Sequence, residues 1–172
     1  MALYLEAGFE QTTVADIAER ASLTERTFFR HFSDKREVLF SGASALQELM
    51  VVTVRDAPAP IAPLNIIALA LNAAGSMIGE ERDRSRLRQQ VIDANDDLKE
   101  RELIKLAALA SAMAHELRDR GVDEPTASLA AEVGIAAFRI AFERWVRGTE
   151  EGDLVQMIGE SVAQLSVITG QQ

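Results

Sequence analysis

The spacing of apolar residues constrains the fold of this chain more than any other feature. Apolar side chains recur at i, i+3 and i+4 along almost all of its 172 residues, and Val, Ile and aromatic residues never alternate as they do in strands. Hydrophobic residues make up 48% of the sequence, so a sizeable core can be buried. The sequence therefore predicts an all-α fold.

Capping residues and helix breakers divide this pattern. Helices are expected at residues 1–7, 14–21, 25–32, 34–55, 63–79, 83–95, 97–120, 124–147 and 153–169. Gly8 ends the first helix, and Thr13 and Thr24 cap the second and third. Three of the four prolines fall within residues 56–63, where we place the main break in the chain. We assign residues 1–40 to an N-terminal helix-turn-helix domain and residues 41–172 to a C-terminal helical domain.

Two adjacent phenylalanines, Phe28 and Phe29, lie within a polar stretch of the third helix. Neighbours on a helix point about 100° apart, so a short helix packed on a core buries only one of them. Phe28 and Phe32 share a face that is expected to pack, with Leu23, on the second helix. Phe29 is then either a contact surface for DNA, which we favour, or a second core residue that touches the neighbouring domain.

A short helix pair joined by a tight turn is typical of a helix-turn-helix unit, whose last helix enters the major groove. The net charge of −9 argues against a protein coated for nonspecific nucleic-acid binding, yet residues 24–36 carry four basic and two acidic side chains. Some side chains of this unit are expected to contact base edges, and others are expected to contact phosphates. The predicted DNA contacts are Thr13, Thr24, Glu25, Arg26, Thr27, Phe29, Arg30, His31 and Lys35, with Arg36 as a further phosphate partner.

The segment "GFEQTTVADIAERASLTERTFFRHFSDKREVLF", residues 8–40, resembles the N-terminal domain of the TetR family of bacterial transcriptional repressors. The resemblance implies an all-helical homodimer with two DNA-binding heads, double-stranded operator DNA as partner, and release of the operator when a small-molecule effector binds the C-terminal domain. Two residues depart from the family pattern: Ser22 replaces the usual turn glycine, and Phe29 replaces a frequent tyrosine. A serine in the left-handed conformation costs about 1 kcal/mol.

Large and adaptable side chains in the C-terminal helices suggest an effector pocket with an apolar lining, suited to an apolar or amphipathic molecule. The predicted lining is Ile67, Leu71, Met77, Leu87, Val91, Leu109, Met113, Phe138, Phe142 and Trp145, with plain core packing as the alternative for these side chains. The arginine-rich residues 81–90 are interpreted as a solvated helix face, with an anion site as the alternative.

Small residues recur along one face of the helix at 124–147, and the last helix carries a second apolar face. Close approach of two helices needs small side chains, so these faces are predicted to form the seam of a two-fold dimer. The predicted interface is Ala130, Gly134, Ala137, Ala141, Leu154, Ile158, Ser161 and Leu165.

Other functions find little support in the sequence. His115 is followed by Glu116, but no second histidine stands four residues on, and no phosphate-binding loop or nucleophile elbow is present. We expect no enzyme activity, no metal and no cofactor. No signal peptide and no membrane span are recognised, which favours a cytoplasmic protein. The rival interpretation is a helical-bundle carrier or protein-interaction module without specific DNA binding, and activation in place of repression also stays open.

Overall fold

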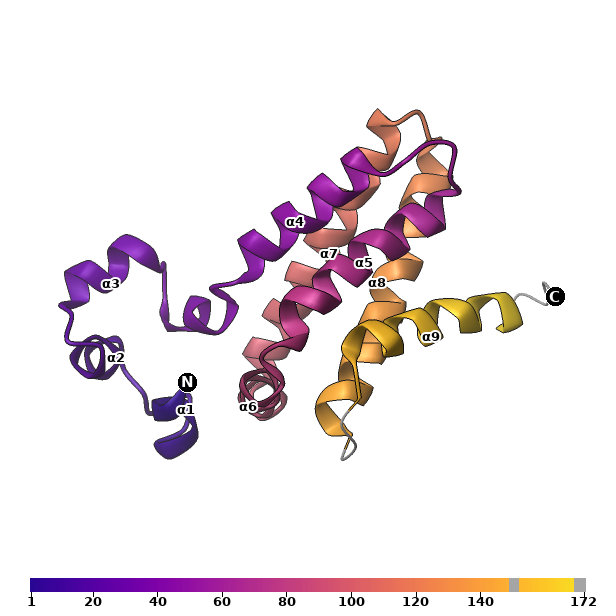
Figure 1. Cartoon of the computed structure of the whole chain (residues 1–172). Coiled ribbons are helices and arrows are strands. Elements are labelled where there is room, and N and C mark those ends of the chain that lie inside the picture. Colours follow the sequence, from indigo (N-terminus) through magenta and orange to yellow (C-terminus); the bar gives the residue numbers. More distant parts are fainter. Residues whose placement is uncertain (149–151, 169–172) are drawn as a thin grey trace.

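A computed structural model describes residues 1–148 and 152–168 of the chain, and these residues contain helices and no strand (Figure 1). The predicted all-α class is confirmed. The elements are α1 (Ala2–Glu6), α2 (Val14–Arg20), α3 (Glu25–His31), the 3₁₀ helix η1 (Lys35–Phe40), α4 (Ala43–Asp56), α5 (Pro63–Gly79), α6 (Arg82–Asp93), α7 (Asp96–Asp119), α8 (Glu124–Arg147) and α9 (Leu154–Ile168). The last helix was expected to reach residue 169, which lies outside the described residues.

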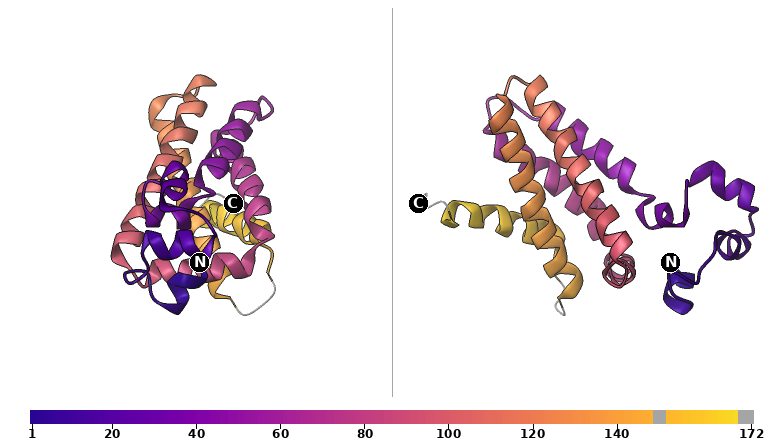
Figure 2. Two further views of the ribbon diagram at one scale, coloured as in Figure 1. Left: turned by 90° about the vertical axis from the view of Figure 1, so that its left-hand side faces the viewer. Right: turned by 180° about the vertical axis from the view of Figure 1, so that it is seen from behind.

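The helices from α1 to η1 form a small head beside one end of a bundle of longer helices (Figures 1 and 2). Local chemistry sets the limits of α2. The Thr13 side chain accepts a hydrogen bond from the backbone N–H of Asp16, and the Asp16 carboxylate accepts one from the N–H of Thr13. At the other end Ser22 has a φ of +56°, and the Leu23 N–H donates to the Ala18 carbonyl at 2.8 Å. This is the left-handed helix stop predicted for Ser22.

The small core of the head differs in part from the prediction. Phe28 is 3% exposed and lies 5.2 Å, between ring centroids, from Phe32, as expected. Leu23 is 49% exposed and does not join this core. The prediction for Leu23 was wrong because the left-handed turn at Ser22 carries the chain away from the apolar face of α2.

The predicted fourth helix is divided in two. Asp34 caps η1 by accepting from the backbone N–H groups of Arg36 and Glu37, and α4 begins only after Gly42. The Tyr4 hydroxyl donates to the carbonyl of Lys35 at 2.5 Å, which ties η1 to α1. As a result η1 belongs to the head, and α4 belongs to the bundle.

The bundle is built mainly from α4, α5, α7 and α8, which pack on one another, and α9 packs across α5 and α8. Because α4 and α5 pack together, the proline-rich segment between them is a loop that connects two helices of the bundle. It is not the main break in the chain. The core includes Trp145, whose indole N–H donates to the Gly152 carbonyl at 3.0 Å.

Among the described helices, α8 alone is long and apolar enough to cross a membrane by length and composition. Core helices of soluble proteins meet the same criterion. In this chain α8 contributes Ala131, Ile135, Ala141 and other buried residues to the bundle core. Packing inside the chain therefore accounts for the buried face of this apolar helix.

A second apolar cluster joins the head to the bundle. Tyr4, Phe9, Leu39 and Phe40 of the head are buried together with Val91 and Ile92 of α6 and Leu98 of α7. Val91 thus belongs to this junction and not to the predicted pocket. This shared cluster places α6 and α7 in direct apolar contact with the head.

Candidate nucleic-acid interface and ligand cavity

The two phenylalanines of α3 point in different directions. Phe28 is buried, whereas Phe29 is 54% exposed although its ring lies against Phe28 at 5.4 Å. Arg26 and Arg30 are exposed as well. Phe29 is therefore not a second core residue that touches the neighbouring domain. The exposed aromatic ring and the two exposed arginines offer an apolar contact and two positive charges on one short helix.

The threonines predicted to contact phosphates also cap helices. Thr24 accepts from the Thr27 N–H at 3.2 Å, and the two hydroxyls lie 3.0 Å apart. The Thr13 hydroxyl donates to Asp16 at 2.7 Å. His31 lies at the end of α3, where its Nε2 is 3.4 Å from the Arg30 guanidinium. All these groups are on the outside of the head, and the caps fix the start of each helix.

Lys35 has a different role from the predicted phosphate contact. Its ammonium donates to the carbonyls of Phe9, Glu10 and Thr12 at 2.8, 3.1 and 3.1 Å, and lies 4.5 Å from the centre of the Phe9 ring. Because an ammonium has three donors, this set of carbonyls uses all of them. Lys35 therefore stabilises the segment between α1 and α2.

Arg36 is likewise engaged within the head, since its guanidinium lies 3.0 Å from Asp34. Burial disfavours the ionised form of the Asp34 carboxyl, but hydrogen bonds from Arg36 and from the backbone outweigh burial and lower its pKa. The charges of Arg36 and Asp34 offset each other at the start of η1.

A cavity of about 770 Å³ lies where the head meets the bundle, within the ~300–1,000 Å³ range of organic-ligand sites. Its walls come from η1, the start of α4, the end of α5, α6, the first half of α7 and the second half of α8. The apolar lining includes Leu46, Met77, Ile78, Leu103, Leu106, Leu109, Phe138 and Phe142. The charged lining is Glu81, Arg84, Arg88, Asp93, Lys99, Glu102, Lys105, Arg139, Glu143 and Arg147. The cavity is therefore amphipathic.

Charged side chains next to this cavity bind η1 to the bundle. Arg101 and Lys105 of α7 donate to the Glu37 carboxylate at 2.6 and 3.3 Å. Arg88 of α6 donates to the Leu39 carbonyl at 2.8 Å and to Glu102 at 2.9 Å. Burial acts to raise the pKa of Glu37, but the two cations outweigh it and lower this pKa overall.

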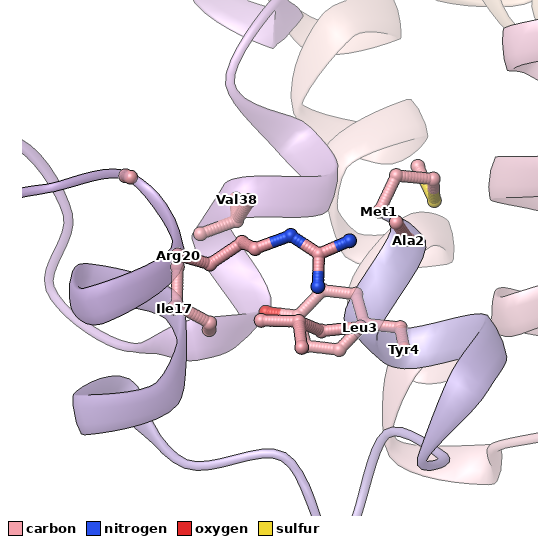
Figure 3. Close-up of a pocket in the computed structure, with 8 residues that line it drawn as sticks. Met1, Ala2, Leu3, Tyr4, Ile17, Arg20 and Val38 are labelled. Atoms are coloured by element: carbon pink, nitrogen blue, oxygen red, sulfur yellow. The ribbon is translucent and has the colours of Figure 1, made fainter.

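A second hollow, of about 250 Å³, lies inside the head between α1, α2 and η1. Figure 3 shows the Arg20 guanidinium extending from α2 across this space towards Leu3 and Tyr4 of α1. Arg20 also pairs with Glu6 at 3.4 Å. The hollow is smaller than most sites for organic ligands and is partly filled by this side chain.

The head has known relatives. Residues 1–41 match the family model described as "Bacterial regulatory proteins, tetR family". Over 81 residues the chain is 40% identical to the HTH-type transcriptional regulator TcmR of Streptomyces glaucescens, a match that covers 47% of this chain and 34% of the length of TcmR. Residues 1–41 belong to the TetR family. This is a family of transcriptional regulators and not of enzymes, as the sequence predicts.

Two solved TetR-family structures share the fold over nearly the whole chain. Thermus thermophilus FadR, a TetR-family transcriptional repressor in complex with lauroyl-CoA, has a TM-score of 0.61 and 22% identity, covering 96% of this chain and 88% of FadR. The TetR-family regulator PfmR, also from Thermus thermophilus, has a TM-score of 0.55 and 18% identity, covering 95% of this chain and 92% of PfmR.

Of the predicted pocket residues, the cavity contains Met77, Leu109, Phe138 and Phe142. The others lie elsewhere. Ile67, Leu71, Met113 and Trp145 are at most 1% exposed and belong to the bundle core, and Leu87 is 39% exposed outside the cavity lining. Helical periodicity identified the buried faces, but it does not distinguish a face that lines a cavity from one that is closely packed.

The small-residue face of α8, predicted as a dimer seam, is filled by the same chain. A Cβ on Gly134 would lie 2.3 Å from Cγ2 of Ile67 in α5. Ala130, Ala137 and Ala141 are at most 8% exposed. In α9, Leu154, Ile158 and Ser161 are buried as well, and Leu165 is half-buried. The close approach of two helices was foreseen, but the partner of α8 is α5 and not a second chain.

The arginines of α6 were interpreted as a solvated face, which is correct for Arg84, paired with Glu81 at 2.7 Å. It is wrong for Arg82 and Arg86. Arg82 donates to the carbonyls of Trp145 and Gly148 at 2.7 and 3.0 Å, and Arg86 donates to that of Val146 at 3.0 Å. These two guanidinium groups satisfy the free carbonyls at the end of α8.

Proposed function

We propose that this chain is a repressor that binds double-stranded operator DNA through α3 and releases it when an amphipathic small molecule binds in the cavity. The observation that carries the proposal is the exposure of Phe29, Arg26 and Arg30 on α3, while the buried Phe28 anchors the helix. Residues 1–40 serve as the DNA-binding domain and residues 41–172 as the effector and dimerisation domain. A regulator that acts on chromosomal DNA works in the bacterial cytoplasm.

The decisive experiment measures DNA binding by fluorescence anisotropy, with an operator obtained by selection from random sequences. Arg26 lies in the first turn of α3, where base edges are reached, so Arg26→Ala is expected to weaken operator binding by about 1–3 kcal/mol and relax specificity. The matched control is Arg84→Ala, which removes an exposed arginine of α6. Operator binding that is unchanged in Arg26→Ala, or no specific binding by the wild type, would favour the carrier or protein-interaction alternative.

Release by a ligand requires that the ligand bind the released arrangement of the heads better than the DNA-bound one. The position of the cavity supports such coupling, because Leu39, Phe40 and Gly42 at the base of the head form part of its wall. Thermus FadR was crystallised with lauroyl-CoA, which is amphipathic. The mixed apolar and charged lining favours an amphipathic effector over a wholly apolar one.

A second copy of the chain is the partner that we propose for the exposed face of α8. Leu129 and Ile140 are 66% and 51% exposed, and Ala136 between them is also exposed. The adjacent face of α9 has Gly159, at which an added Cβ would meet nothing within 4 Å. The far end of α9 projects beyond the bundle in Figures 1 and 2. One head makes few base contacts, and a two-fold pair doubles them.

A further inference from the structure

We propose that the cavity selects an organic anion with an apolar tail, and that Arg139 and Lys105 bind its acidic group. The inference rests on the proposed function of the cavity as the effector site. The inference adds the charge of the effector and the residues that recognise this charge. It also names the contact that the effector weakens, between Lys105 of α7 and Glu37 of η1.

The apolar tail has a suitable surface. Leu103 and Leu106 of α7 face the cavity together with Phe138 and Phe142 of α8, whose rings are stacked with centroids 6.0 Å apart. Burial of a hydrocarbon chain against such side chains gives affinity in proportion to its length. This surface alone would accept a neutral and a charged ligand equally well.

The charged lining decides between them. Its carboxylates have cationic partners: Glu81 pairs with Arg84 at 2.7 Å, Glu102 with Arg88 at 2.9 Å, and Asp93 with Arg147 at 3.4 Å. Glu143 also lies 3.9 Å from Arg147.

Arg139 differs from the other lining cations, because it forms no ion pair within residues 1–148 and 152–168. A guanidinium presents two parallel donors that match a carboxylate or phosphate. A ligand anion would supply the partner that this side chain lacks, and a ligand cation would be repelled.

Lys105 connects the acidic group to the head. It lines the cavity, lies 5.5 Å from the centre of the Phe40 ring, and donates to Glu37 of η1 at 3.3 Å. Arg101 holds the same carboxylate more closely, at 2.6 Å, and does not line the cavity. The lysine is the more distant of the two partners of Glu37, and of the two only the lysine lines the cavity. A ligand anion that binds Lys105 competes with Glu37 and loosens η1 from α7.

The test uses three probes of equal chain length and different charge: decanoate, decanol and decyltrimethylammonium. Binding to the full chain is measured by isothermal titration calorimetry below the micelle concentration. We expect decanoate to bind about tenfold more tightly than decanol, a difference of about 1.4 kcal/mol, and the cation to bind least. Arg139→Gln should remove the preference for decanoate over decanol. Arg118→Gln is the matched control, since Arg118 of α7 lies outside the cavity lining and pairs with Glu124, and it should keep the preference.

Glu37→Gln tests the competition separately. Without the carboxylate that shares Lys105, the variant should bind decanoate several-fold more tightly than the wild type does and bind decanol unchanged. Equal binding of decanoate and decanol, or a preference that survives in Arg139→Gln, would overturn the inference. If decanol then released the operator, the proposed function would stand and only the charge selection would fail. Release by none of the probes, with decanoate bound in the cavity, would instead overturn the proposed function.

Discussion

At the scale of the residue, one position of the head shows how a side chain predicted to contact DNA can serve structure. Lys35 lies just after α3, where a phosphate contact is expected, yet its ammonium is surrounded by three carbonyls from the segment between α1 and α2. The ring of Phe9 covers the same group at 4.5 Å. These contacts hold together two parts of the head that are more than twenty residues apart.

Replacing this residue separates the two roles. Lys35→Met keeps the hydrocarbon stem but leaves the three carbonyls without their donor, so we expect a loss of about 1–3 kcal/mol in the free energy of unfolding. Urea denaturation followed by circular dichroism measures it. Lys99→Met is the control, because its pair with Asp96 is exposed, and it should change stability by less than about 0.5 kcal/mol. If Lys35→Met kept its stability and its operator binding depended less on salt, Lys35 would be a phosphate contact and not a structural residue.

At the scale of the element, η1 is the part of the head on which both neighbours act. It is capped by Asp34, bound to α1 through Tyr4, and joined to α7 through Glu37. A six-residue 3₁₀ helix has poor hydrogen-bond geometry of its own, so its position depends on these contacts. The Glu37 ion pairs are therefore expected to matter for how firmly the head is held.

The pH dependence of stability follows from the lowered pKa of Glu37. The folded state favours the carboxylate, so its contribution to stability is present above the unfolded pKa, near 4.5. That contribution is lost as the pH falls through the still lower folded pKa. At neutral pH we expect the free energy of unfolding of the wild type to exceed that of Glu37→Gln by on the order of 1 kcal/mol. The value is modest because the side chains are partly exposed to solvent. Urea denaturation at a series of acidic pH values should show the free energies of unfolding of the two proteins converge as the pH falls. A difference that stays constant with pH would contradict the lowered pKa of Glu37.

At the scale of the whole molecule, α8 has one face packed inside the bundle and another that leaves apolar side chains exposed. The small residues of α8 are packed on α5, whereas Leu129, Ala136 and Ile140 face outward. This face and the exposed side of α9 are where we place the dimer. The arrangement sets the distance between the two heads, and hence the spacing of half-sites.

Ile140→Glu should place two uncompensated charges in a two-fold interface and cost several kcal/mol of dimer stability. We expect a monomer in light scattering and a collapse of operator affinity. Gly134→Ala is the informative comparison, because its Cβ would collide with Ile67 inside the bundle. It should lower the free energy of unfolding by about 1–3 kcal/mol and leave the oligomeric state unchanged. If Ile140→Glu stayed dimeric, or if Gly134→Ala were stable but monomeric, the exposed face of α8 would not be the interface. The small-residue face of α8 would then be the better candidate.

The sequence by itself determined the features that depend on near neighbours along the chain. The limits of α2 and α3, the caps at Thr13 and Thr24, the left-handed stop at Ser22 and the division of Phe28 from Phe29 all follow from contacts within a few residues. These are settled by helical geometry and capping, which operate at that range.

Only the tertiary structure decided which element each buried face meets. The contacts of Arg82 with Trp145, and of Glu37 with Arg101, join residues more than sixty positions apart, and no local pattern records them. An amphipathic helix fixes which side chains avoid water, but α5, a second chain and a ligand would all satisfy the same apolar face. For that reason the small residues of α8 and the lining of the cavity could be assigned only once the helices were seen packed together.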